Sequence, residues 1–214
     1  MNRRTILLVA VALGATACAS FGKKEQGALI GATVGAAAGG VVGNNTGSTA
    51  RGAIIGAVVG GAAGAIIGHQ MDQQAKELRL EIPGATVERV GEGIAVTFSS
   101  GLLYDFDSDA IRSTAGANLE SLANSLKKYP DTALLIVGHT DALGSTSYNQ
   151  ELSQRRSDAA MRYLGQYGVS AGRIRSTGRG ELEPIGSNES EAGRSSNRRI
   201  EVAIFANANA RGNQ

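Results

Sequence analysis

Glycine occurs at every fourth position in two stretches of this sequence, and that spacing limits the possible folds more than any other feature. The two runs are offset by 25 residues and form an internal repeat: Gly27, Gly31, Gly35, Gly39 and Gly43, then Gly52, Gly56, Gly60, Gly64 and Gly68. Positions i and i+4 share one face of a helix, so each run predicts a helix with a smooth strip where another backbone can approach closely. Because each glycine costs about 0.5–1 kcal/mol against alanine inside a helix, such a strip has to be packed.

The length and polarity of this region predict a helical hairpin over residues 27–68. Each run covers 17 residues, and such a helix would measure about 26 Å, close to the bilayer's hydrocarbon thickness of about 30 Å. The polar connector 44–51 suits a turn and ends with Arg51, the only charged residue of the region. Insertion into a bilayer and self-association through the glycine strips both fit this pattern. A flexible linker is the alternative, because alanine and glycine bury little apolar area.

The first residues have the organisation of a secretory signal peptide, predicted to span 1–17. Arg3 and Arg4 precede an apolar segment that is too short to cross a membrane, and small residues precede Cys18. Because Cys18 is the chain's single cysteine, an internal disulfide framework is excluded. The cleavage site resembles a bacterial lipobox, although Ala15 replaces the usual leucine. This resemblance implies acylation of Cys18 by groups such as palmitate, sorting to the outer membrane because Ala19 is not aspartate, and an acylated linker over 18–26. A secretory signal without lipidation is the alternative.

Charge balance and rare residue types argue against several classes of function. Without Arg3 and Arg4 the chain has 19 basic and 19 acidic residues, which removes the electrostatic basis for nucleic-acid binding. Two distant histidines and one cysteine expected to be modified form no metal-ligand cluster. Asp105, Asp107 and Asp109 lack the glycine and the final glutamate of a calcium loop. We therefore expect neither a metal nor a cofactor.

Residues 84–206 alternate between strand-like and helix-like periods and predict a separate domain. The polar, helix-prone segment before it is broken by Pro83 and Gly84, so 69–83 is assigned as a linker and 207–214 as a flexible tail. Strands are expected at 93–98, 102–106, 133–137, 173–177 and 200–205, with helices at 111–129 and 147–167. The order β-α-β-α-β-β predicts an α+β fold, a mixed sheet with helices on one side.

One arginine in the second predicted helix of this domain lies on the apolar face of that helix. Arg156 interrupts an apolar stripe, whereas Arg155 lies on the solvated side. An inward guanidinium needs a carboxylate from the protein or from a ligand. Asp141 follows the apolar strand 133–137 and is the internal candidate. Asp141 and Arg156 could together bind a zwitterion or simply form a structural salt bridge, and the residues alone leave both open. A hydrolytic triad with His139 is disfavoured because Arg156 would compete for the carboxylate, so we do not expect an enzyme.

Four segments of this domain resemble, in order, the motifs of the OmpA-like peptidoglycan-binding domain. They are Tyr104-Asp105-Phe106-Asp107-Ser108, Gly138-His139-Thr140-Asp141, Tyr148-Asn149-Gln150-Glu151-Leu152-Ser153-Gln154-Arg155-Arg156 and Asn197-Arg198-Arg199-Ile200-Glu201. With the lipobox and the glycine zipper in front, the whole chain resembles the YiaD-type outer-membrane lipoproteins more closely than Pal, which lacks the zipper.

The resemblance implies a ligand and a set of binding residues. Asp141 would bind the free amine of meso-diaminopimelate in the peptidoglycan stem peptide, and Arg156 its carboxylate. Asn149 and the backbone near Asp107 and Ser108 would add hydrogen bonds.

A further binding residue and the overall role also follow from the resemblance. Arg199 would contribute to binding, although Arg198 or Arg199 could instead pair with Asp105 or Asp107. The expected role is an outer-membrane lipoprotein, its C-terminal domain in the periplasm, that binds peptidoglycan noncovalently and tethers the outer membrane to the wall. The alternative is a membrane-inserting or oligomeric glycine-zipper assembly for which wall binding is only a mooring.

Overall fold

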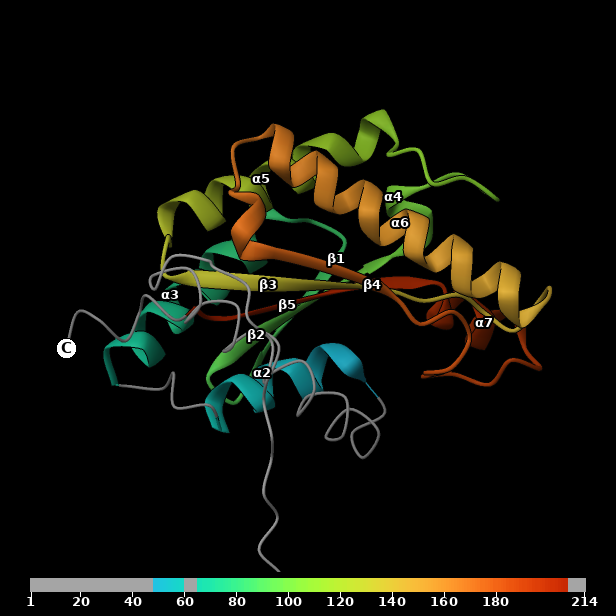
Figure 1. Ribbon diagram of the computed structural model, residues 1–214, viewed down its shortest axis with the longest axis horizontal. Helices are drawn as coiled ribbons and strands as arrows, with labels where there is room; N and C mark the ends of the chain where they lie inside the picture. Colours follow the sequence, from blue (N-terminus) through green and yellow to red (C-terminus); the bar gives the residue numbers. More distant parts are fainter. Residues whose placement is uncertain (1–47, 60–64, 208–214) are drawn as a thin grey trace, which may run out of the picture.

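The computed structural model describes residues 48–59 and 65–207 (Figure 1). The signal peptide 1–17, Cys18, the acylated linker, the first glycine run and the tail after residue 207 lie outside the described residues. Predictions for those segments therefore stay predictions.

A five-stranded sheet forms the centre of the molecule, with the strand order β1-β2-β5-β3-β4. Its strands are β1 (Ala85–Val90), β2 (Gly93–Ser99), β3 (Thr132–Gly138), β4 (Ile174–Gly178) and β5 (Arg199–Ala206). All neighbours are antiparallel except β3 and β4, which run parallel. The helices are α2 (Thr49–Val59), α3 (Ala65–Glu81), α4 (Ser100–Leu103), α5 (Gly116–Lys128), α6 (Thr146–Gln166) and α7 (Glu191–Asn197), with short 3-10 turns at Ser113–Ala115 and Ala171–Arg173. The α+β fold with a mixed sheet is confirmed.

One face of the sheet, which we call the front face, carries the main hydrophobic core. Successive strand residues point to opposite faces, so alternate residues of β2, such as Ile94, Val96 and Phe98, share this side. Helices α5 and α6 lie over it in Figure 1, and Leu119 and Leu122 of α5 are fully or almost fully buried there. The front face thus has the sheet-and-helix layering that the sequence pattern predicts.

Helix α2 covers the opposite face, which we call the rear face (Figure 1). Three residues of α2 are buried against three residues of the sheet: Ala50, Ala53 and Ile54 against Ala95, Val137 and Ala203. Small side chains on both sides allow this close approach. A Cβ at Gly93 would lie 2.5 Å from Cγ2 of Ile54 and 2.6 Å from the carbonyl oxygen of Ile204, so only glycine fits there without a shift.

The second glycine run differs from the expected half of a hairpin. Its first residues belong to α2, which ends at Val59, and its last, Gly68, lies in α3. The packing partner of α2 is the rear face of the sheet, a surface that the glycine spacing alone does not indicate. Among the described helices, none combines the length and apolar character needed to cross a membrane.

The segment 69–83, expected to be a linker, is an integral part of the core. Helix α3 buries Met71, Ala75 and Leu78, and Ile82 follows directly after it. These apolar residues recur at helical spacing within a mostly polar segment, so α3 is amphipathic and packs on β1 and α5. Gly84, at a φ of 81°, then turns the chain into β1.

The strands of the structure also differ from the predicted strands in two places. Residues 102–106 were expected to form a strand, but α4 ends at Leu103 and only Tyr104 pairs, in a single bridge with Ile111. Strand β1 was not predicted. It is an edge strand with exposed Thr86 and Glu88 on either side of buried Val87, so its apolar signal is short.

Candidate ligand-binding site

The site begins where β3 ends, because α6 crosses very close to that strand end. A Cβ at Gly138 would lie 2.2 Å from the carbonyl oxygen of Ser153, so glycine there lets α6 lie directly over β3. The chain then runs through His139 and Thr140 to Asp141, beside the first turns of α6. Ser145 caps α6 by accepting a hydrogen bond from the Tyr148 amide.

Asp141 is buried and held by three contacts. Its Oδ1 accepts a hydrogen bond from the Leu143 amide at 3.0 Å, and its Oδ2 accepts one from Arg198 Nη1 at 2.6 Å. Its carbonyl oxygen accepts from Asn149 Nδ2 at 3.2 Å. Only 6% of Asp141 is exposed, so this carboxylate has a fixed orientation.

Arg198 links Asp141 to a second carboxylate. Its Nη2 donates to Glu191 Oε1 at 2.6 Å. The hydrogen bonds that Arg198 donates to Asp141 and to Glu191, in that order of importance, raise the pKa of Arg198. Asp141 therefore pairs with Arg198, and the structural salt bridge between Asp141 and Arg156 that the sequence left open is not formed.

Arg156 is buried on α6 without a carboxylate partner among residues 48–59 and 65–207. Its Nε donates to the carbonyl oxygen of Ser108 at 2.8 Å, and its Nη2 to that of Asp105 at 3.4 Å. The guanidinium lies 5.3 Å from the centroid of the Tyr104 ring. Burial lowers the pKa of Arg156, an effect that Tyr104 and Asp107 oppose. A buried cation met only by carbonyls and an aromatic face is suited to accept an anion.

The loop carrying Asp107 and Ser108 is fixed to α6. Besides the bond from Arg156 to Ser108, the Tyr148 hydroxyl donates to Asp107 Oδ1. Asp107 has a φ of 55°, the left-handed region, which turns the loop at this point. The Tyr104 hydroxyl donates to the carbonyl oxygen of Arg156 at 2.7 Å, and burial raises its pKa, so it stays a donor.

Asn149 lies at the Asp141 end of the site. It is 2% exposed, and its Nδ2 contacts the carbonyl oxygen of Asp141 and, at 2.5 Å, Glu181 Oε2. Asn149 and Arg156 share one face of α6, because a spacing of seven residues is close to two turns. The structure thus brings five of the predicted residues, Asp141, Asn149, Arg156, Asp107 and Ser108, around the first half of α6.

Arg199 is not brought to this site. It is 1% exposed, and its Nε donates to Glu201 Oε1 at 2.7 Å, under the start of α2. The suggested pairing of an arginine from this motif with Asp105 or Asp107 is not formed either, and Arg112 Nε lies 3.6 Å from Asp105 instead. The arginine that reaches Asp141 is Arg198, one residue earlier in the same Asn-Arg-Arg motif.

Two features that are associated with catalysis in other proteins, a buried histidine and a Gly-x-Ser-x-Gly segment, occur in the described residues. Burial, and then the charge of Arg199, lowers the pKa of His139 to about 3, so this histidine is neutral. The sequence Gly168-Val169-Ser170-Ala171-Gly172 has the spacing of a hydrolase nucleophile elbow. However, Ser170 connects α6 to β4, whereas an elbow connects a strand to a helix. Across the described residues, no three metal-ligating side chains are grouped to hold an ion.

Comparisons with known proteins agree with this fold. Residues 103–198 match the OmpA family, and residues 1–72 match the YMGG-like Gly-zipper family. The probable lipoprotein YiaD of Escherichia coli is 35% identical over 217 residues, covering 95% of this chain and 99% of that protein. The chain belongs to the YiaD lipoprotein family. Its OmpA-like part is the domain built around α6, and its glycine-zipper part includes α2.

Other relatives share only part of the YiaD-family chain. The peptidoglycan-associated lipoprotein of Brucella melitensis is 32% identical over 121 residues, covering 56% of this chain and 72% of that protein. Outer membrane porin F of Pseudomonas aeruginosa is 40% identical over 106 residues, but the chain spans only 30% of the porin's length. A solved structure, the cell wall anchor of the T6SS from P. aeruginosa, is 29% identical, with a TM-score of 0.54 over 64% of this chain and 96% of the other.

Proposed function

We propose that this chain is an outer-membrane lipoprotein whose OmpA-like domain binds peptidoglycan noncovalently and so tethers the outer membrane to the cell wall. The observation that carries the proposal is Arg156, a buried guanidinium that faces the 105–108 loop and has no carboxylate partner in the described structure. The names of the relatives support it, since one is a peptidoglycan-associated lipoprotein and a solved neighbour is a cell wall anchor.

The ligand group that best fits is the free amino-acid end of meso-diaminopimelate in the stem peptide. Its carboxylate would accept a bidentate pair of hydrogen bonds from the guanidinium of Arg156, which has no carboxylate partner in the described structure. Its ammonium would approach Asp141, whose carboxylate keeps acceptor capacity beyond its bonds to Leu143 and Arg198. Asn149 holds the Asp141 backbone, and the 105–108 loop closes the opposite side.

Tethering compensates for weak single contacts. A hydrogen bond to a charged group contributes about 1.5–3 kcal/mol, so two such contacts predict weak affinity for a free muropeptide. A domain fixed to a membrane opposite a polymer with repeated stems gains effective concentration. Acylation of Cys18 after removal of residues 1–17 would provide this anchor, with residues 84–206 in the periplasm.

The position of α2 supports wall tethering as the main role, with the zipper in an accessory one. In the described structure the second glycine run contributes α2 to the rear face of the domain, so this part of the run is used to complete the wall-binding domain.

Sacculus co-sedimentation tests the proposal directly. We expect Asp141→Ala and Arg156→Ala each to abolish binding of the purified full-length protein to sacculi, and free diaminopimelate to displace the wild type. Arg155→Ala is the matched control, because Arg155 lies next to Arg156 on the exposed side of α6 and should bind normally. Circular dichroism checks that each variant is folded. Full binding by both folded site variants would refute the assignment.

A further inference from the structure

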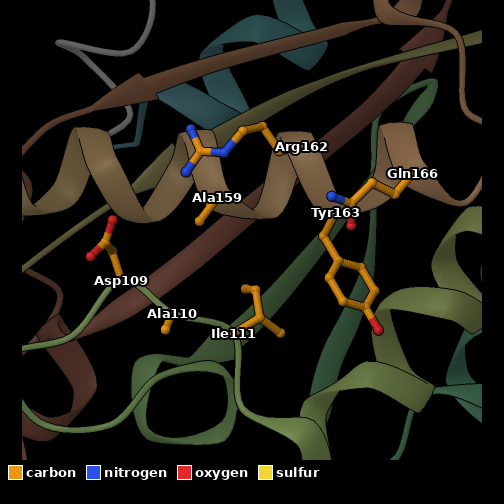
Figure 2. Close-up of a pocket in the computed structure, with 7 residues that line it drawn as sticks. All are labelled: Asp109, Ala110, Ile111, Ala159, Arg162, Tyr163 and Gln166. Carbon is orange, nitrogen blue, oxygen red and sulfur yellow. The ribbon is translucent and has the colours of Figure 1, made fainter.

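Beyond Arg156, α6 and the loop 109–111 border a cavity of about 380 Å³ that is open to solvent (Figure 2). The loop contributes one wall and α6 the other, as Figure 2 shows. The lining residues are Asp109, Ala110, Ile111, Ala159, Arg162, Tyr163 and Gln166. Its volume is near the lower limit for ligand sites, about 300–1,000 Å³, which favours a small group over an oligosaccharide.

The cavity continues the Arg156 end of the binding site. Arg156, Ala159 and Tyr163 have the spacing i, i+3 and i+7, so they share one face of α6. The opposite wall is also continuous, because Ser108 accepts the hydrogen bond from Arg156 and Asp109 is the next residue. A stem peptide whose free diaminopimelate carboxylate is bound at Arg156 carries the next residue on the other centre of the diamino acid, and that centre could direct the residue along α6 into this cavity.

The lining has an apolar part and one charge of each sign. Ile111, Ala159 and the Tyr163 ring form the apolar part. Arg162 is exposed and forms no ion pair with any carboxylate in the described part of the chain. The carboxylate of Asp158, one helical turn earlier, accepts hydrogen bonds from Gln154 and Ser176 instead. Arg162 is therefore available to an anionic group of a ligand.

We propose that this cavity is a subsite for the residue that follows the diamino acid in the stem peptide, a terminal D-alanine. The inference rests on the proposed function, because it takes the diaminopimelate site as the neighbouring subsite. The methyl group would pack on Ile111, Ala159 and Tyr163. The terminal carboxylate would pair with Arg162, and Asp109 would accept the peptide N–H. A small apolar group with a free carboxylate matches the lining in both size and charge.

Binding of two stem peptides that differ only by the terminal D-alanine tests the subsite. The probes are γ-D-glutamyl-diaminopimelate with and without D-alanine, titrated calorimetrically into the full-length protein in detergent. We expect the wild type to bind the longer peptide about three- to tenfold more tightly, the range of a single charge-assisted contact. Arg162→Gln should abolish that preference and leave affinity for the shorter peptide unchanged. Arg155→Gln, an exposed arginine on another side of the same helix, should keep the preference.

The outcomes separate this inference from the function on which it rests. If the wild type binds neither peptide, the proposed function fails. If it binds both equally, or if Arg162→Gln keeps the preference, the subsite is refuted while the diaminopimelate site stands. If Arg162→Gln lowers the affinity for both peptides by the same factor, Arg162 binds the glutamyl carboxylate that the two probes share, and the D-alanine assignment is wrong.

Discussion

The two faces of the sheet are buried by different means. On the front face, large side chains such as Phe98, Leu119 and Leu122 fill the space between the sheet and its helices. On the rear face, α2 buries two alanines and one isoleucine, a much smaller apolar area. Because apolar burial contributes about 25 cal/mol per Å², the front face supplies most of the stabilisation. Polar contacts therefore contribute a larger share of the stabilisation that holds α2 on the rear face.

Those polar contacts gather at the N-terminal end of α2. Ser48 Oγ donates to Glu201 Oε2 at 2.6 Å, and the Thr49 amide donates to Glu183 Oε2 at 2.9 Å. Arg179 Nε donates to Thr49 Oγ1 at 2.8 Å. Two carboxylates at a helix N-terminus also interact favourably with the helix dipole. The residues under α2, which we call the rear charged cluster, are His139, Glu183, Arg199 and Glu201.

Equal truncations on the two faces should have unequal effects. Leu122 and Ile54 are both fully buried, in α5 and α2 respectively. We expect Leu122→Ala to lower the free energy of unfolding by about 3 kcal/mol. Ile54→Ala should lower it by less than about 1 kcal/mol and mainly increase amide exchange in α2, because this helix can open locally. Chemical denaturation and hydrogen exchange measure the two effects. Equal losses would mean that both faces belong to one cooperative unit.

The rear charged cluster should make stability depend on pH through His139. Burial holds the pKa of His139 at about 3, against 6.5 for an exposed histidine. The neutral folded form is therefore fully favoured above pH 6.5, and stability is lost as pH falls below that value toward 3, by up to about 1.4 kcal/mol per pH unit.

Denaturation at pH 7 and pH 5 measures this dependence. His139→Gln should lose less stability over that interval than the wild type. His69→Gln, a change of the chain's other histidine, which is exposed, should behave like the wild type. Glu201, whose own burial is outweighed chiefly by the charge of Arg199 so that its pKa is lowered, adds a loss at more acidic pH in all three proteins. An identical pH dependence in His139→Gln and wild type would contradict the prediction.

The smallest effect is expected at the exposed edge of α2. Arg51 Nη2 and Glu88 Oε2 are 2.5 Å apart, but each side chain is 48% exposed. Exposed pairs contribute little, so Glu88→Gln should change the opening free energy of α2 by less than about 0.5 kcal/mol in hydrogen exchange. Glu183→Gln, which alters the more buried partner of Thr49, should have the larger effect. The reverse order would show that surface charge, and not the helix N-terminus, positions α2.

The OmpA-like domain was largely predictable because its signals are local. The long apolar stripes predicted α5 and α6, and the position of Arg156 within a stripe indicated an inward cation. The docking of α2 was not predictable, because an alanine and glycine pattern suits many packing partners equally. The choice between Arg198 and Arg199 depended on one residue of strand register, which decides the face that a side chain takes. The pairing of Arg198 with Asp141 could be identified only from the three-dimensional fold.

The placement of α2 has a mechanical consequence for the proposed tether. Ser48 is the first described residue, and under the proposed function tension between an anchored N-terminus and a wall-bound domain would act on the contacts of Ser48 and Thr49 before it reached the sheet. Helix α2 would peel away before load reaches the strand pairing of β2 and β5. Under moderate force such a tether would lengthen while the domain stays bound to the wall.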